Sequence, residues 1–323
     1  MTPPTLDALD LKLLQALELD GRAPFSRIAQ VLGVSDQTVA RRFRRLRTAA
    51  HLRVTGVSDD SRLGLTSWIV RLGCSQNTAT QLAITLAGRP DTHYIDLVAG
   101  GTEVVCAIRP RNRLERDEVL LERLQRTPHI TSVSAHCILH TYYGNSLRWL
   151  RKISALDPDE ETALRAPVPP PTRTPIALDA ADQTMLDVLR RDGRATLTEL
   201  QAATGLSDNV LKRRLENLRS TGVLYLAVGY DHEPLGRGVE ALCWLTVAPQ
   251  SLAEAGRAVA VHPEVRFAAA VTGRTNLVVS VLCRTTADLY TFVDEKIGAL
   301  TGIHTAETIL TLRRVKTLTS EAR

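Results

Sequence analysis

Five arginines crowd one short stretch of the chain and are the residues best suited to bind a polyanion. Residues 36–48 read DQTVARRFRRLRT, and Asp36 is the only acidic residue among them. A guanidinium group binds phosphate or a guanine edge through paired hydrogen bonds, so a helix that carries several of them fits the major groove of DNA. The arginines are Arg41, Arg42, Arg44, Arg45 and Arg47.

Residues 26–48 have the pattern of a helix-turn-helix, which would present these arginines. Gly33 stands where a helix end needs a left-handed residue, and Ser35 stands where the next helix needs an N-cap. The second helix of such a motif enters the major groove. Apolar residues recur at helical spacing on both sides of the turn, at Ile28, Ala29, Leu32, Val34, Val39, Phe43 and Leu46.

The motif recurs 172 positions later, in residues 198–220. Gly205 corresponds to Gly33 and Arg213 to Arg41. Roughly a third of the positions in residues 6–64 match residues 178–236 without a gap, which is the mark of an internal repeat. We interpret the chain as a tandem duplication.

The first recognition helix is predicted to read bases at its N-terminal end and phosphates on its flanks. Gln37 suits adenine, Arg41 suits guanine, and Thr38 suits a thymine methyl group or a phosphate. The alternative is a solvated helix face with no partner. The predicted contacts are Ser35, Gln37, Thr38, Arg41, Arg42, Arg44 and Arg45, and replacing Arg41 and Arg45 together by alanine should weaken binding.

The second recognition helix carries less positive charge. Glu216 and Asn217 stand where the first helix has Arg44 and Arg45. We therefore expect this helix to bind DNA more weakly and to read a different half-site, and a decayed motif that only supports ligand sensing stays open. Its predicted contacts are Ser207, Asn209, Lys212 and Arg213.

Each helix-turn-helix is preceded by a helix that ends in Asp-Gly-Arg, at residues 20–22 and 192–194. Arg22 and Arg194 could each contact a phosphate, cap a helix or form an ion pair. A short strand follows each recognition helix, at residues 52–57 and 223–229.

The periodicity then becomes strand-like, and the order β-α-β-β-α-β appears twice. We predict an α+β chain with two winged helix-turn-helix domains and two ferredoxin-like domains. Such a domain leaves one sheet face bare, so two could cover each other, and we also expect self-association. The predicted elements are 66–74, 77–87, 93–99, 102–108, 114–126 and 130–143, then 239–247, 250–261, 265–272, 276–283, 286–300 and 303–316.

The halves are joined by a proline-rich stretch, APVPPPTRTP, in residues 166–175. Polyproline is an extended spacer, and we interpret it as a tether. Residues 147–153 and 158–164 could form short helices before it. The predicted domains are 1–58, 59–145, 146–177 (linker), 178–230 and 231–323.

Composition fits a globular protein with an anionic partner. The net charge is +5 over 323 residues, and no apolar run approaches the roughly 20 residues of a membrane span. The first residues lack the pattern of a signal peptide, so we expect a cytoplasmic protein. The five cysteines form no CxxC pair, which predicts buried free thiols and neither a disulfide nor a metal site; no cofactor is expected.

Taken together, LDxxDxxLLxxLxxDGR, a helix-turn-helix ending in RRxxxLRxxxxL and the β-α-β-β-α-β order resemble the Lrp/AsnC family of transcription regulators. The family pattern occurs twice, and the two copies together span nearly the whole chain, with only the linker left outside. It implies binding to double-stranded DNA, assembly through the C-terminal domains of the RAM type, and a small-molecule effector such as an amino acid. Family members normally carry one such unit and dimerise, so this chain resembles a fused pair.

The resemblance also implies an effector site at the turn between the second and third strands of each ferredoxin-like domain. The family often has Asp where this chain has Glu103 or Asn276, and an ordinary hairpin turn would explain the glycines equally well. The matching residues are Gly100, Gly101, Thr102 and Glu103, and Gly273, Arg274, Thr275 and Asn276.

An enzyme of the same plan is the main alternative. The sirohaem decarboxylases resemble this family, and His93, His136, His140, His232 and His304 could surround a tetrapyrrole. That branch tends to have a Phe-Pro element where this chain has Asp-Gly-Arg. The chain shows no nucleophile–base pair and no phosphate-binding glycine loop, so we predict no catalytic residue and a protein that is not an enzyme.

Overall fold

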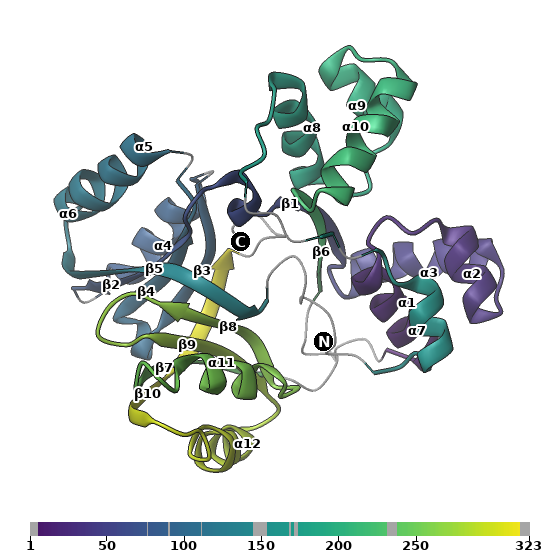
Figure 1. Ribbon diagram of the computed structural model, residues 1–323. Helices are drawn as coiled ribbons and strands as arrows, with labels where there is room; N and C mark the ends of the chain where they lie inside the picture. Colours follow the sequence, from purple (N-terminus) through teal and green to yellow (C-terminus); the bar gives the residue numbers. More distant parts are fainter. Residues whose placement is uncertain are drawn as a thin grey trace. The chain divides into compact units, whose positions relative to one another are not determined.

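The computed structural model describes residues 6–75, 77–89, 91–110, 112–144, 154–167, 169–170, 174–230 and 238–316 (Figure 1). The chain divides into two compact units. The first comprises Met1–Gly64 and Trp149–Leu235, and the second Leu65–Arg148 and Gly236–Arg323. The predicted helix at 147–153 lies outside the described residues.

The first helix-turn-helix consists of α1 (Ala8–Leu19), α2 (Phe25–Leu32) and α3 (Asp36–Ala49). Gly33 ends α2 with φ 65°, and the Ser35 hydroxyl accepts a hydrogen bond from the Thr38 N–H, so both predicted caps are confirmed. The apolar faces meet in one core that includes the fully buried Leu14, Leu17, Ile28 and Leu46.

The second helix-turn-helix repeats this order with α8 (Ala180–Arg191), α9 (Leu197–Thr204) and α10 (Asp208–Ser220). Gly205 ends α9 with φ 71°, as predicted. Ser207 occupies the N-cap position of α10, but its side chain makes no capping hydrogen bond.

One strand from each half forms a two-stranded antiparallel ribbon, β1 (Arg53–Ser58) with β6 (Leu224–Gly229). Thr55 lies opposite Ala227, which is 172 positions later, the offset of the repeat. On either side of this pair, Val54 lies opposite Val228 and Gly56 lies opposite Leu226. With the same offset of 172, Leu226 is the counterpart of Val54 and Val228 is the counterpart of Gly56, so the two pairs are equivalent. The ribbon therefore has a local two-fold axis at Thr55.

The linker contains a helix, α7 (Pro158–Leu164), that packs against α1 and α2 (Figure 1). Lys12 Nζ lies 2.6 Å from Glu160 Oε1, and Gln15 Oε1 accepts hydrogen bonds from the N–H groups of Ala155 and Leu156 at 2.7 and 2.8 Å. Leu164 is fully buried in the core of the first helix-turn-helix. The predicted short helix at 158–164 is therefore confirmed, and it belongs to the core of the first helix-turn-helix.

In the second unit each ferredoxin-like order is present, with ends within three residues of the predicted ones. A 3-10 turn, η1 (Asp60–Leu63), ends the first segment of the first unit. The first half of the second unit then has β2 (Trp68–Cys74), α4 (Ala79–Ala87), β3 (Thr92–Val98), η2 (Ala99–Gly101), β4 (Glu103–Ile108), α5 (Arg113–Asp117), the π-helical η3 (Glu118–Arg123), α6 (Leu124–Arg126) and β5 (Ile130–Tyr143). The second half has β7 (Val239–Val247), α11 (Leu252–Ala260), β8 (Val265–Val271), β9 (Leu277–Cys283), α12 (Thr286–Thr291), the π-helical η5 (Phe292–Ile297) and β10 (Ile303–Lys316).

The strands of the second unit close into one barrel, ordered β10-β3-β4-β2-β5-β8-β9-β7 (Figure 1). Two seams join the halves, β3 with β10 and β5 with β8. The outer face of each sheet packs against the helices of its own half and forms a hydrophobic core there. A third cluster fills the interior of the barrel and includes Ile69, Val105, Leu242, Trp244 and Ile309. The inner sheet faces therefore cover each other.

Among the described residues, no helix has the length and apolar character needed to span a bilayer, and no group of His, Cys, Asp and Glu side chains is placed to hold a metal ion. Cys106, Cys243 and Cys283 are buried as predicted, and Cys74 and Cys137 are only half-buried. Burial raises the pKa of the Cys106 thiol to about 12.

Candidate nucleic-acid interface and ligand sites

Helix α3 presents an exposed row of polar and basic residues. Val39 and Leu46 are buried, which turns the opposite side of the helix to solvent. Gln37, Arg41 and Arg44 are exposed, and Thr38 and Ser35 sit at the capped N-terminus. The predicted base-reading and phosphate-binding positions are thus accessible together on one short helix.

Two of the predicted DNA contacts are instead tied to helix α1. Arg42 Nη1 lies 2.6 Å from Asp7 Oδ2 and 3.0 Å from Asp10 Oδ1, and Arg45 forms an ion pair with the other oxygen of Asp10. The Asp10 side chain is fully buried. The hydrogen bond from Arg42 holds the pKa of the Asp7 carboxyl below its usual range. Arg42 and Arg45 therefore hold the recognition helix on its scaffold.

Replacing Arg42 by alanine is expected to act on stability more than on DNA binding. The change removes the charged hydrogen bonds from Arg42 to the carboxylates of Asp7 and Asp10 and leaves the buried Asp10 with Arg45 as its remaining ion-pair partner, at a cost of about 1–3 kcal/mol. Thermal unfolding should report this loss. A matched Arg47→Ala variant, which removes an exposed arginine of the same helix, should unfold like the wild type. Equal unfolding midpoints for the two variants would contradict the scaffold role.

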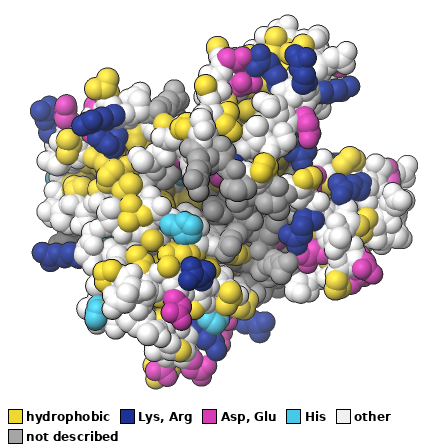
Figure 2. Space-filling view, in the orientation of Figure 1, with side chains coloured by type: hydrophobic (Ala, Val, Ile, Leu, Met, Phe, Trp, Pro, Cys, Tyr) yellow, Lys and Arg dark blue, Asp and Glu magenta, His cyan; other side chains and the backbone are white. Residues whose placement is uncertain are grey.

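The second recognition helix keeps this tie to the scaffold but not the basic face. Arg214, the counterpart of Arg42, lies 2.8 Å from Asp179 Oδ2 and 2.8 Å from Asp182 Oδ1. Figure 2 shows Lys and Arg side chains over the α8–α10 region with acidic side chains between them. The exposed residues of α10 are Asp208, Asn209, Lys212, Arg213, Glu216, Asn217 and Ser220.

The Asp-Gly-Arg loops bind each other. Arg22 donates to the carbonyl oxygens of Gly193 and Ala195 at 2.7 and 2.9 Å, and Arg194 donates to those of Gly21 and Ala23 at 2.6 and 3.0 Å. We call this reciprocal pair of contacts the arginine clasp. It differs from the capping, ion-pair and phosphate roles that the sequence left open.

Glycine is required in both clasp loops because the strands of the ribbon approach closely. A Cβ on Gly21 would lie 2.7 Å from Leu226 Cβ, and a Cβ on Gly193 would lie 2.9 Å from the backbone carbon of Thr55. The clasp and the ribbon therefore form one continuous contact, and each helix-turn-helix is fixed relative to the other within the first unit.

The first predicted effector turn is open at its tip. A Cβ on Gly100 or Gly101 would meet nothing within 4 Å. The Thr102 hydroxyl donates to the Ala99 carbonyl at 2.7 Å, which is an internal turn contact. The Glu103 carboxylate accepts a hydrogen bond from Arg71 Nη2 at 3.1 Å, so its negative charge is paired with an arginine of strand β2.

The second predicted turn is closed by contacts with its neighbours. The Asn276 amide pairs with both backbone groups of Val247, at 2.8 and 2.7 Å. The His136 Nδ1 lies 2.6 Å from the Thr272 carbonyl and would lie 2.6 Å from a Cβ on Gly273. Arg274 contributes its carbonyl to the Thr246 hydroxyl, and Thr275 is half-buried. The two turns are therefore unlike in this chain.

Arg71 links the first turn to the far strand of the barrel. Its Nη1 and Nη2 atoms lie 2.7 and 2.8 Å from the two carboxylate oxygens of Glu307, and its guanidinium lies 5.8 Å from the centre of the Trp244 ring. The hydrogen bonds from Arg71 hold the pKa of the Glu307 carboxyl below its usual range.

Replacing Arg71 by alanine should reduce the amount of unfolding free energy that the barrel loses when the pH is lowered into the acid range. A carboxyl whose pKa is lowered by folding stabilises the native state above its unfolded pKa of about 4.3 and loses that contribution as the pH falls through the folded value. The stability gap between wild type and Arg71→Ala should thus be largest near neutral pH and shrink below about pH 4. Urea unfolding at several pH values measures the gap; a gap that widens in acid would contradict this account.

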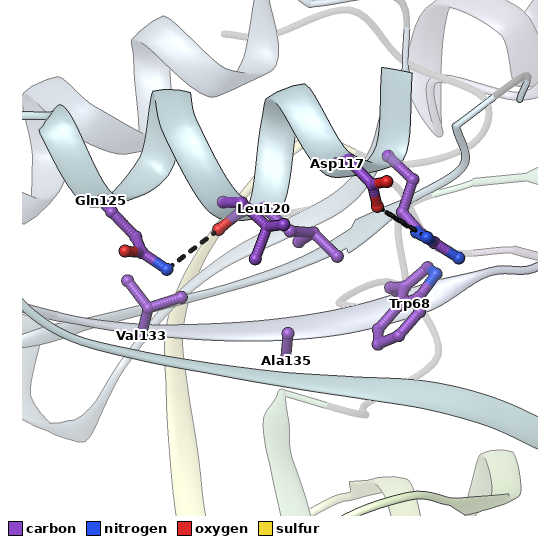
Figure 3. Close-up of a pocket in the computed structure, with 8 residues that line it drawn as sticks. Trp68, Asp117, Leu120, Gln125, Val133 and Ala135 are labelled. Atoms are coloured by element: carbon purple, nitrogen blue, oxygen red, sulfur yellow. Dashed lines mark hydrogen bonds and ion pairs between the residues drawn. The ribbon is translucent and has the colours of Figure 1, made fainter. Parts of the chain in front are cut away.

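A pocket of about 520 Å³ lies between the α5–α6 helical segment and strands β2 and β5 (Figure 3). Trp68, Val133 and Ala135 line its sheet side, Leu120 and Gln125 line its helix side, and Asp117 lies at one end. None of these residues could be singled out as a candidate ligand contact from the sequence. The counterpart helix in the second half buries Leu289, Phe292 and Ile297 against its sheet, in the packed outer core of that half.

Comparison with known proteins identifies related domains in three parts of the chain. An AsnC-type helix-turn-helix domain matches residues 6–47, a winged helix-turn-helix DNA-binding domain matches residues 178–225, and an Lrp/AsnC ligand binding domain matches residues 240–320.

Two curated relatives match about half of the chain along nearly their own full length. The HTH-type transcriptional regulator FL11 of Pyrococcus horikoshii is 29% identical over 146 residues, which cover 45% of this chain and 95% of that protein. The leucine-responsive regulatory protein of Rhizobium meliloti is 32% identical over 146 residues, which cover 44% of this chain and 93% of that protein.

A likeness in fold extends over nearly the whole chain. The solved siroheme decarboxylase NirDL, in complex with an iron-uroporphyrin III analogue, aligns with a TM-score of 0.65 at 15% identity and covers 98% of this chain and 94% of that chain. At this identity the likeness concerns the fold alone.

Proposed function

The chain belongs to the Lrp/AsnC family of transcriptional regulators, and on that premise we propose that it arose by tandem duplication and binds DNA as an intrachain pseudo-dimer. It is a regulator with DNA-binding and ligand-binding domains. The proposed domains are 1–58 and 178–230 for DNA, 59–145 and 231–323 for ligand sensing, and 146–177 as linker.

The observation that carries the pseudo-dimer is the two-fold register of the β1–β6 ribbon together with the arginine clasp. Thr55 lies opposite its own counterpart, and Arg22 and Arg194 exchange equivalent contacts. Two helix-turn-helices related by a two-fold axis suit a palindromic operator, with half-sites one helical turn (about 10 bp) or a multiple of it apart.

The operator is proposed to be an imperfect palindrome. In the first half, Gln37 and Arg41 would read bases and Arg44 would contact phosphate; in the second half, Asn209 and Arg213 would read bases. Glu216 beside Asn217 reduces the attraction of α10 for phosphate relative to α3. The first half-site would therefore supply most of the affinity.

An effector such as an amino acid is proposed to bind at the first turn, Gly100–Glu103, where the glycine tip is open. The second turn, with Asn276 held by Val247, is less accessible to a ligand. We also propose that the protein forms a homo-oligomer and acts in the cytoplasm.

The decisive experiment is binding of the full chain to its own promoter fragment across a salt series, with and without a mixture of amino acids. Specific binding that weakens steeply with salt supports the regulator, because released counterions set the slope. A change with the mixture supports an effector, and indifference to the mixture removes the amino-acid proposal. Absence of binding at low salt would overturn the DNA-binding function, and a tetrapyrrole titration followed by absorption would then test the enzyme alternative.

A further inference from the structure

The two barrel seams have the same backbone pairing but different side chains. Val98 lies opposite Thr311 in one seam, and Val271 lies opposite Ile138 in the other. Counterparts in the two halves of the barrel are 173 positions apart, so these two pairs are equivalent. Any difference between the seams therefore comes from side chains at equivalent positions.

The β3–β10 seam is joined by a buried ion pair. Arg314 Nε and Nη2 lie 2.7 and 2.8 Å from the two carboxylate oxygens of Asp96, whose side chain is 5% exposed. Arg314 Nη2 also lies 2.7 Å from Glu240, which in turn pairs with Arg266 at 3.0 Å. Asp96 comes from the first half, whereas Arg314, Glu240 and Arg266 come from the second.

The β5–β8 seam has neither charge of that pair. Thr141 stands at the position equivalent to Arg314, and Ala269 stands at the position equivalent to Asp96. A first half paired with another first half would place Asp96 opposite Thr141. This would leave a buried carboxylate without its cation, which is strongly destabilising.

The same seams also differ in shape. Tyr142, near the end of β5, is buried in the outer core of the second half, and a Cβ on Gly256 would lie 2.1 Å from its ring. The equivalent residues are Val315 and Ala83, both buried in the outer core of the first half. A first–first pair would therefore press the Tyr142 ring onto the Ala83 methyl group, and overpacking of this kind is costly.

We propose that these two contacts, the ion pair and the tyrosine against glycine, select the partner of each sheet. A first sheet closes with a second sheet and rejects the first sheet of another copy. Charge and shape are independent and favour the same pairing, which is how specificity against wrong partners is built. The inference rests on the proposed intrachain pairing and adds the reason for its selectivity.

The test uses four substitutions, each of which copies the residue at the equivalent position of the other seam. They are Asp96→Ala, Arg314→Thr, Tyr142→Val and Gly256→Ala, and together they remove both differences between the seams, the ion pair and the tyrosine against glycine. A reporter is added to the full chain by Leu97→Cys and His140→Cys, because position 97 of β3 and position 140 of β5 lie in different seams of one barrel and would face each other only in a first–first pair.

Refolding under oxidising conditions, followed by mass spectrometry of disulfide-linked peptides, counts the first–first pairs. We expect at least a fivefold higher yield of the 97–140 linked peptide from the four-substitution chain than from the wild-type seams. Equal yields would overturn the proposal. Promoter binding is not the readout, so failure here leaves the DNA-binding proposal intact, and loss of promoter binding would leave the seam result intact.

Double-mutant cycles in the full chain keep the proposal testable if the four-substitution chain fails to fold. Arg314→Thr alone and Gly256→Ala alone should lower the unfolding midpoint. Adding Asp96→Ala to the first and Tyr142→Val to the second should each restore most of that loss. If neither pair shows recovery, the seam contacts are not complementary and the proposal is wrong.

Discussion

Replacing Arg41 and Arg44 together by alanine is expected to weaken promoter binding by about two orders of magnitude and to reduce the salt slope by about one. One bidentate contact to a base is worth about 1–3 kcal/mol, and each neutralised phosphate contributes about 0.9 to the slope. Arg41 and Arg44 are exposed on α3 and form no ion pair with any residue in the described part of the chain. Fluorescence anisotropy with the promoter fragment measures both quantities.

The matched control is Arg213→Ala with Lys212→Ala in α10. This variant also removes two exposed cations but should have the smaller effect, because Glu216 already weakens that helix for phosphate. Arg45 is left intact because it forms an ion pair with Asp10. Its removal would weaken the attachment of α3 to α1 as well as any DNA contact, and the two effects on affinity could not be separated. Wild-type affinity and slope in a folded Arg41 and Arg44 variant would exclude α3 as the main reader.

Removing the arginine clasp, by Arg22→Ala with Arg194→Ala, is expected to uncouple the two helix-turn-helices. Each guanidinium loses two hydrogen bonds to backbone carbonyls, and charged hydrogen bonds contribute about 1.5–3 kcal/mol each at most. Affinity for a two-half-site operator should fall more than tenfold, because a flexible pair loses the advantage of preorganised spacing. Affinity for a single half-site should change little.

Arg27→Ala is the control for this pair. Arg27 also donates to a backbone carbonyl, that of Ala163, but on the α7 side of the first helix-turn-helix and away from the clasp. It should leave the ratio of two-site to one-site affinity unchanged. An equal loss for single and double half-sites in the clasp variant would show that the clasp only stabilises the fold.

Local signals in the sequence predicted the elements well. Turn glycines such as Gly33 and Gly205 and the change from helical to alternating periodicity each depend on neighbouring residues, and the helices and strands lie where these signals placed them. The sequence did not decide whether the two sheets of one chain pair with each other or with sheets of another copy. A bare sheet face shows that it must be covered but not which chain supplies the cover.

Contacts between distant parts could not be read in this way. Nothing adjacent to Arg42 in sequence reveals that Asp7 and Asp10 bind it, and the roles of Arg22 and Arg194 depend on a ribbon that joins residues 172 apart. An exposed arginine and a scaffold arginine look alike in a helical pattern, because charge is visible in sequence and geometry is not.

The closed order of the barrel also bears on how copies of this protein can meet. A sheet edge is the usual place where a foreign strand adds to a sheet or where aggregation begins, and a closed barrel removes such edges. Here β3 and β5, which would be free edges of a lone first sheet, are paired with β10 and β8. Larger assemblies would then grow through helix surfaces such as the exposed Leu121, and the barrel itself is protected from strand addition.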